Sequence, residues 1–204
     1  MKTIAQRKLK GEHNMVHIEV HHIVNALKFA RAFAATRDVR YYLNGIHVDV
    51  DPVESKLRLT GTDGHRFGRI TLDVRAPDDF EPFIIPLDRA DAFLKITKPK
   101  KSDTYTVPLS DSTVGELAFT PIEGKYPDCD GMFDRVTSAD RKEGERTGIN
   151  FSYLEDACKA AKHVGNKKFG AWSMTFSGAN HPMLLELDSP EYFNAAALIM
   201  PVKL

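Results

Sequence analysis

The sequence predicts an α+β fold made of repeated βαβββ units, with helices on one face of antiparallel sheets. Short segments that alternate apolar and polar residues, as strands do, are interrupted by segments with helical periodicity. This pattern starts three times along the chain. Ile18, Ile84 and Asn150 occupy equivalent places in the three copies, each 66 residues after the one before. Constant spacing of this kind is typical of a fold built by repeating one structural unit.

The first unit begins after Met15 with the strand-like segment VHIEV. A helix follows, with Lys28 on its polar face and these apolar residues on the other: Ile23, Ala26, Leu27, Ala30, Phe33 and Ala34. Three strands are then predicted over residues 40–50, 56–60 and 66–74. Turns at Asp51-Pro52 and in TDGH separate these strands.

The second unit begins with FIIP at residues 83–86, and its helix is expected to stop before Pro99 because proline disrupts a helix interior. Strands are predicted at 104–109 and 115–122. The third unit begins with GINF at residue 148. Its helix has an apolar face made of Tyr153, Leu154, Ala157, Ala161 and Val164, and the strands AWSMTF, PMLLEL and AAALIMPVKL follow.

Four segments follow from these repeats. Residues 1–14 are expected to be an N-terminal arm or an edge strand, and residues 15–133 a domain of two units. Residues 134–147 are predicted to be a linker, because they are charged and poor in apolar side chains. Residues 148–204 are predicted to be half a domain, with a single unit.

Composition indicates a globular, cytoplasmic protein. The 204 residues are 42% hydrophobic, and 28 basic residues balance 28 acidic ones. Cys129 and Cys158 form no CxxC motif, which favours a reducing compartment. No apolar run approaches the roughly 20 residues that a membrane-spanning helix needs. We therefore expect no membrane association.

The charges are unevenly distributed even though their sum is zero. The three predicted helices with their adjacent loops, residues 22–40, 87–101 and 151–168, hold 13 basic and 5 acidic residues. This pattern suits helices that face a polyanion such as DNA. It is also found on ordinary solvated helices, so charge alone leaves both interpretations open.

Motifs for enzymatic chemistry are absent from the sequence. It contains no GxxxxGK[ST], GxGxxG or GxSxG segment. The histidines His13, His17, His21 and His22 do not form a consistent tetrahedral set, because a strand over VHIEV sends His22 to the opposite face from His17 and His21. No serine or cysteine is placed to be activated by Asp63 and His65. We expect neither a catalytic centre nor a cofactor nor a metal, and a metal-dependent nuclease is the remote alternative.

Six segments occur in the chain order of a known family. RDVRYYLNGIHVDV, TDGHRFG, FIIP, GKYPD, GINFSY and IMPVKL resemble the bacterial DNA polymerase III β sliding clamp. Residues 15–133 resemble the middle domain of that family, and residues 148–204 resemble the second half of its last domain. The family's first domain and the first half of its last domain have no counterpart in this sequence. The compact form suggests a clamp from a phage or mobile element.

The resemblance implies a DNA-clamp fold and a processivity factor that encircles duplex DNA as a homo-oligomeric ring. Such a ring tethers a polymerase or other replication proteins through a peptide-binding pocket, with a clamp loader as a further partner. Matched residue by residue, the pocket comprises Leu43, Thr62, Gly64, His65, Arg66, Phe67, Pro127, Asn150, Tyr153, Leu198, Ile199, Met200, Pro201, Val202, Lys203 and Leu204. The chain departs from the family after KYPD, where it reads CDGMFD.

The same resemblance assigns a DNA-facing role to Tyr41 and Tyr42, which strand propensity alone would place as ordinary strand residues. The basic residues expected to face DNA are Lys28, Arg31, Lys95, Lys159 and Lys162. Likewise, TDGHR on its own is a common turn signal and MPVKL on its own reads as a buried strand, although either can also line a pocket.

Two questions about function stay open at this point. Rings of the resembled family contain twelve units, so chains of three units predict a homotetramer, with a trimer or a dimer as alternatives. A chain that keeps the pocket without half of the ring could instead be a decoy or regulator, which binds clamp-interaction motifs or a full-length clamp without encircling DNA.

Overall fold

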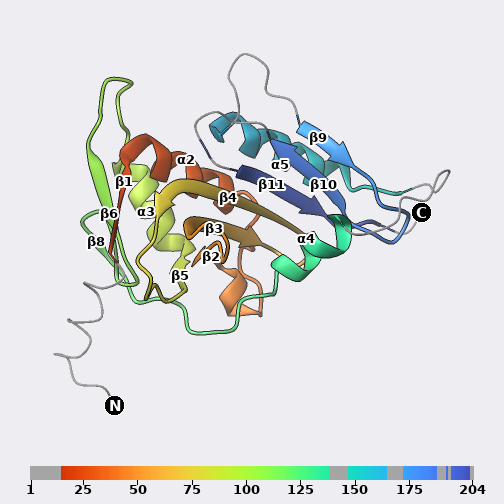
Figure 1. The fold of residues 1–204 in the computed structure, drawn as a ribbon, viewed down its shortest axis with the longest axis horizontal. Helices are drawn as coiled ribbons and strands as arrows, with labels where there is room; N and C mark the ends of the chain where they lie inside the picture. Colours follow the sequence, from red (N-terminus) through yellow and green to blue (C-terminus); the bar gives the residue numbers. More distant parts are fainter. Residues whose placement is uncertain (1–14, 138–146, 165–171, 188–191, 193, 203–204) are drawn as a thin grey trace.

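The fold is described by a computed structural model, which covers residues 15–137, 147–164, 172–187, 192 and 194–202 (Figure 1). The strands are β1 (Val16–Glu19), β2 (Gly45–Val50), β3 (Lys56–Thr62), β4 (Arg66–Arg75), β5 (Phe83–Pro86), β6 (Thr106–Leu109), β7 (Thr113–Val114), β8 (Leu117–Ala118), β9 (Trp172–Thr175), β10 (Met183–Leu187) and β11 (Asn194–Ile199). The helices are α2 (Val20–Arg31), α3 (Leu87–Ile96), α4 (Asp130–Thr137), α5 (Phe151–Val164) and the 3₁₀ helix η1 (Tyr41–Leu43).

Two antiparallel sheets organise these elements. The larger has seven strands in the order β5-β2-β3-β4-β11-β10-β9, and the smaller has four in the order β1-β6-β7-β8. The first two units exchange their opening strands, because β1 pairs with β6 while β5 pairs with β2. The third unit extends the larger sheet through β11, which pairs with β4 and places Leu198 opposite Phe67. Periodicity predicts the individual strands but not this exchange.

The seven-stranded sheet has two faces, which we call the helical face and the opposite face, and its central strands β3, β4 and β11 are mostly buried on both. Ile70 of β4, Leu185 of β10 and Ala197 of β11 point to the helical face, where they join one core with residues of α2, α3 and α5. Phe67 and Leu198 alternate with them and point to the opposite face, into a second core. The expected α+β architecture is confirmed, and its helices α2, α3 and α5 share one face as predicted.

The middle helix, α2, approaches the sheet very closely. Gly61 of β3 and Gly68 of β4 are directly opposed in the register. A Cβ atom at Gly61 would lie 1.9 Å from the carbonyl oxygen of Ala30, and one at Gly68 would lie 2.2 Å from the Phe33 ring. The glycine pair therefore forms the notch in which the carboxyl end of α2 rests.

The predicted strand over residues 40–50 is wrong in its first half. Tyr41–Leu43 form η1, and β2 begins only at Gly45. The reason is a side-chain contact: the amide of Asn44 accepts a hydrogen bond from Asp38 N and donates one to Asp38 O, at 2.8 and 2.9 Å. These bonds close a loop that removes the tyrosines from the sheet.

Three other expectations also need correction. The predicted strand over 115–122 is reduced to the two-residue strand β8, which pairs with the equally short β7 just before this range. The GINF segment contributes only an isolated bridge between Gly148 and Val202. Residues 134–137 of the expected linker belong to α4, which Figure 1 shows apart from the other three α-helices. The rest of the linker up to residue 146, and the expected arm at 1–14, lie outside the described residues.

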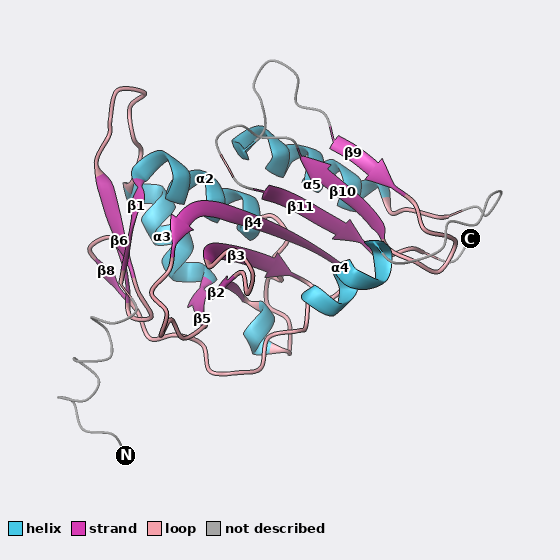
Figure 2. Ribbon diagram, viewed as in Figure 1, coloured by secondary structure: helices cyan, strands magenta, loops and turns pink. Residues whose placement is uncertain are grey.

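Figure 2 shows the strands of the large sheet across the middle of the molecule, with β9 and the small sheet at opposite ends. Among the described helices, none has the length and apolar character that crossing a membrane requires.

Candidate functional site

The turn between β3 and β4 is fixed by its own side chains. The Thr62 hydroxyl donates to the carbonyl of Arg66 at 2.7 Å and accepts from Gly64 N at 3.1 Å. The Asp63 carboxylate accepts from the backbone N–H groups of His65 and Arg66 at 2.9 and 3.0 Å. Gly64 has φ +87°, a left-handed conformation that glycine adopts without strain. The result is a rigid turn that carries His65 on its surface.

Helix α5 of the third unit packs against this turn. The Arg66 guanidinium lies 4.8 Å from the centroid of the Tyr153 ring and forms ion pairs with Asp63 at 3.1 Å and Asp156 at 2.8 Å. The His65 ring stacks on Tyr153, with centroids 6.3 Å apart and planes at 19°. Arg66 and Tyr153 thus join the first unit to the third through cation–π and ionic contacts.

The start of α5 and the end of β11 complete this group. The Asn150 side-chain oxygen accepts from Ser152 N at 3.0 Å and so caps α5. Met200 N donates to the carbonyl of His65 at 2.9 Å, and Val202 N donates to that of Gly148 at 2.9 Å. Met200 and Pro201 are half-buried, and Val202 is 40% exposed. Lys203 and Leu204 lie outside the described residues.

Three apolar residues of the expected pocket lie in the second core. Leu43, Phe67 and Leu198 are at most 1% exposed and form one cluster with Val136 of α4. Phe133 of α4 meets the Phe67 ring edge-on, with centroids 4.8 Å apart. Ile199 points to the helical core instead, and Pro127 is exposed on the loop before α4. Helix α4 therefore covers the apolar part of the site.

A buried group of charges lies under the start of α4. Arg58 is 5% exposed and donates to both carboxylate oxygens of Asp49, at 2.9 and 2.7 Å, and to both of Asp130, at 3.2 and 3.3 Å. Arg69 also binds Asp130, and its guanidinium lies over the Phe133 ring. Burial opposes ionisation of Asp130, but the charges of Arg69 and Arg58 outweigh it and hold the pKa of this carboxyl below its ordinary value.

Neutral side chains complete this charged group. His47 stacks on Tyr126 with ring centroids 4.6 Å apart, and burial lowers the pKa of His47. Burial also raises the pKa of Tyr126 and raises that of Cys129 to about 12. His47, Tyr126 and Cys129 are therefore uncharged at neutral pH.

The residues expected to face DNA fall into two groups. Arg31 is paired with Asp91 of α3, and Lys159 with Glu155 and Asp156 at 2.7 and 3.6 Å. Lys28, Lys95 and Lys162 form no ion pair with another residue in the described part of the chain. Burial and the neighbouring charge of Lys28 lower the pKa of His163. Helices α2 and α5 are in contact with each other.

The two expected tyrosines lie in η1 and not on these helices. Tyr41 is 59% exposed, and its ring meets Tyr42 edge-on with centroids 5.8 Å apart. The loop between α2 and η1 is closed by the hydrogen bonds of Asn44 to Asp38. These bonds fix where the two tyrosines lie relative to α2.

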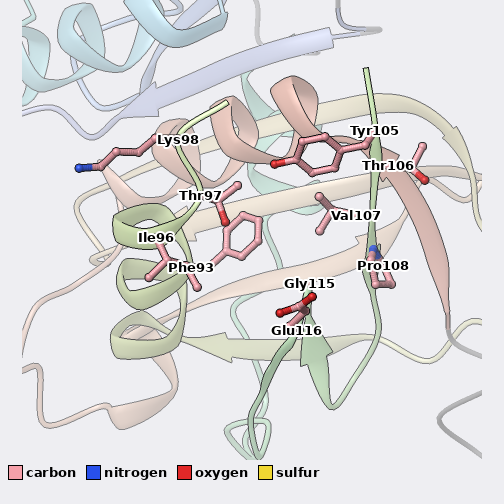
Figure 3. A pocket seen from close by; sticks show the side chains of 10 residues that line it. All are labelled: Phe93, Ile96, Thr97, Lys98, Tyr105, Thr106, Val107, Pro108, Gly115 and Glu116. Atoms are coloured by element: carbon pink, nitrogen blue, oxygen red, sulfur yellow. The ribbon is translucent and has the colours of Figure 1, made fainter. Parts of the chain in front are cut away.

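Two surface cavities lie elsewhere. One, of about 450 Å³, lies between the end of α3 and the strand β6, where Figure 3 shows the Phe93 ring extending from α3 toward Tyr105 and Val107. The other, of about 420 Å³, is lined by His47, Glu81 and Asp111 among others. Neither contains a residue of the expected pocket. Within the described residues, no group of three or more His, Cys, Asp or Glu side chains is arranged to hold a metal ion, and His13 is outside them.

Comparison with known proteins decides the family. Residues 14–128, more than half of the sequence, match the family model described as the DNA polymerase III beta subunit, central domain. The chain belongs to the DNA polymerase III beta subunit family. It is 26% identical over 199 residues to the beta sliding clamp of Pseudomonas aeruginosa, covering 93% of this chain and 47% of that protein. It is 26% identical over 170 residues to that of Vibrio cholerae, covering 81% and 44%. The chain spans about half the length of these curated relatives.

Solved structures of the family share the fold. The sliding clamp of P. aeruginosa matches with a TM-score of 0.68 and 17% identity over 94% of this chain and 67% of that one. The Bacillus subtilis clamp matches with a TM-score of 0.70 and 17% identity over 95% and 65%. At this identity the structures establish the clamp fold of this family member.

Sequence reasoning missed the residues of α4 that cover the site. Met132, Phe133 and Val136 follow helical spacing, which was a usable signal. It was hidden by Asp130, Asp134 and Arg135, which make the segment resemble a polar linker. Asp156, which fixes Arg66, was also missed because one acidic residue on a helix has no distinguishing sequence pattern.

Proposed function

We propose that this chain is a DNA sliding clamp, a processivity factor without catalytic activity that tethers replication proteins to duplex DNA. The observation that carries the proposal is the pairing of β4 with β11. It brings the His65–Arg66 turn of the first unit against Tyr153 and the end of β11 in the third. These segments are far apart in the sequence. Together they bring the apolar cluster of Phe67 and Leu198, which α4 covers, beside a polar edge, and this combination of apolar and polar groups suits a linear peptide.

The peptide site we propose is the set of sixteen residues predicted from the sequence. Its polar edge is accessible at His65, while its apolar floor, with Phe67 and Leu198, lies under α4. The partners we propose are a DNA polymerase and other replication proteins that carry short apolar binding motifs, with a clamp loader as a further partner, all in the cytoplasm. The name of the curated relatives, beta sliding clamp, supports this class of function.

The DNA-binding surface we propose is the polar side of α2, α3 and α5. Lys28, Lys95 and Lys162 would contact phosphates without reading bases. Each chain has three units, so four chains supply the twelve units of a ring and three chains supply too few. The proposed assembly is therefore a homotetramer that closes around DNA. Among the described residues β9 is the last strand of the larger sheet, and its outer edge offers a place for the next copy to pair.

A decoy or regulator is the second candidate, and one observation favours it. On α3 and α5, acidic residues accompany the basic ones: Asp91 pairs with Arg31, and Glu155 and Asp156 pair with Lys159. A protein that binds clamp-interaction motifs without encircling DNA has no need of a strongly positive helical surface.

Removal of residues 200–204 tests the peptide site. The deletion removes Met200, Pro201 and Val202 from the site but leaves β11 intact, so we expect the fold to persist and binding to fall below detection. Fluorescence anisotropy of a labelled short peptide with leucine and phenylalanine anchors measures binding, and circular dichroism checks the fold. Ile96→Ala, in the cavity beside α3, is the matched control and should bind as the wild type does. Undiminished binding by the folded deletion variant contradicts the site.

Assembly and DNA binding separate a clamp from a decoy. Light scattering should give the mass of a tetramer, and closed circular DNA should retain the protein better than the same DNA made linear. A stable monomer at micromolar concentration contradicts the ring, whereas a trimer contradicts only the count of units. Cleavage of the DNA that depends on divalent ions would favour the nuclease.

A further inference from the structure

Helix α4 is placed where a bound peptide is expected to lie. Its apolar side faces the second core through Val136, which is 2% exposed, and through the half-buried Met132 and Phe133. The Phe133 ring rests edge-on against Phe67, in the cluster that also holds Leu198. An aromatic side chain on this floor makes the contact that the apolar anchor of a peptide would make.

The attachment of α4 to the sheet is local. At its amino end Asp130 binds Arg58 and Arg69, and the Asp130 side chain is still 49% exposed. Near its carboxyl end, Ser177 Oγ donates to the carbonyl of Val136 at 3.0 Å. The helix has eight residues, and helices of this length are not stable alone in water. It therefore stays folded only while these contacts hold it on the floor.

Resting on the proposed peptide-binding function, we propose that α4 is an intramolecular cover of the peptide site. A partner's apolar segment displaces it, and the anchor of that segment takes the place of Phe133 on Phe67 and Leu198. When α4 and Asp130 move away, Arg58 is still paired with Asp49. The buried guanidinium of Arg58 therefore keeps a carboxylate partner in the open state. The cover lowers apparent affinity, because the peptide binds only the fraction of molecules in which α4 is open. Replication partners with several binding contacts then outcompete isolated apolar peptides.

The first test uses the wild-type chain and hydrogen–deuterium exchange. The probe is the labelled peptide with leucine and phenylalanine anchors described above. If α4 is a cover, saturation with the probe exposes its backbone, so amides of residues 130–137 exchange faster in the bound state. Unchanged or slower exchange in a chain that binds the probe makes α4 a fixed wall of the site, which overturns the cover and leaves the proposed function standing.

The second test weakens the attachment of α4. Asp130→Asn removes the charge that binds Arg58 and Arg69, and we expect the dissociation constant of the probe to fall about tenfold. Asp128→Asn is the matched control, since it removes one charge from the same segment but keeps an oxygen to accept from Gly131 N, as Asp128 does at 3.0 Å. The control should bind as the wild type does.

Each outcome of the second test has a separate meaning. Tighter binding by Asp130→Asn alone supports the cover, as does binding by this variant when the wild type fails to bind. Weaker binding by Asp130→Asn, or equal gains in both variants, overturns the cover. Absence of binding by the wild type and by Asp130→Asn overturns the proposed peptide site together with its cover.

Discussion

On the helical face of the seven-stranded sheet, the strands meet three helices through an apolar core, in which Leu59 and Ile70 are fully buried against α2. On the opposite face, the same two strands present Arg58, Thr60 and Arg69 beside Phe67. One face is closed by burial of apolar surface and the other by a short helix held by charges. We therefore expect the helical face to stay closed and the opposite face to open more easily.

Removal of a phenylalanine from each face should separate them by stability. Phe29→Ala on the helical face is expected to lower the free energy of unfolding by about 4 kcal/mol, because the cavity is enclosed by α2 and the sheet. Phe67→Ala should lower the free energy of unfolding by less, about 3 kcal/mol, because α4 can shift and partly fill the cavity. Urea denaturation measures both. Equal losses would contradict the difference in rigidity.

The ion group around Arg58 should contribute more to the free energy of unfolding than an ion pair at the surface. Arg58→Ala leaves Asp49 without its partner in a buried place, and we expect a loss of about 3 kcal/mol. Lys56→Ala is the comparison, because Lys56 pairs with the well-exposed Asp73 at 3.0 Å, and its loss should cost about 0.5 kcal/mol. Similar unfolding midpoints for the two variants would show that the Arg58 group is solvated.

The stability of the fold should also depend on pH through His47, which lies on the opposite face. Burial lowers the pKa of His47 in the folded chain, so the unfolded chain takes up the proton first as the pH falls below about 6.5. Stability is therefore fully present above that pH and is lost as the pH falls toward the folded pKa. His47→Gln should lose less stability than the wild type between neutral and mildly acidic pH, as measured by urea midpoints. Parallel curves would exclude His47 as the cause.

The smallest expected effect concerns charge on the helical side. If Lys95 contacts a phosphate, Lys95→Ala should reduce the slope of log affinity against log salt by about 0.9. Lys159 is already paired with Glu155 and Asp156, so Lys159→Ala should change the slope by less. Binding to duplex DNA at several salt concentrations distinguishes the two. Equal changes would mean that DNA replaces the carboxylate partners of Lys159.

The helical face could be predicted from the sequence because its residues follow the periodic spacing of apolar side chains in helices and strands. Ile23, Leu27 and Ala30 recur at helical spacing and are all fully buried, and the strands beneath them alternate in step. The opposite face could not be predicted in the same way. Arg58, Asp49 and Asp130 read as surface residues. Only the fold shows that they pair and that Arg58 is buried.

The candidate site was predicted in part. Resemblance identified the turn at His65, the end of β11 and Tyr153, which the structure brings together. It also identified Phe67 and Leu198, but α4, which packs on both of them, was not predicted. Tyr41 and Tyr42 were misplaced because the Asn44 bonds to Asp38 override strand propensity.

The pairing of β4 with β11 has a consequence for synthesis on the ribosome. Residues 76–193 separate the two strands, so β4 has one unpaired edge during the whole time that this intervening chain is made. Unpaired edges are sites of aggregation, and contacts between distant residues form slowly. We therefore expect the edge of β4 to stay unpaired until β11 emerges, and a chain truncated before residue 194 to be prone to aggregation.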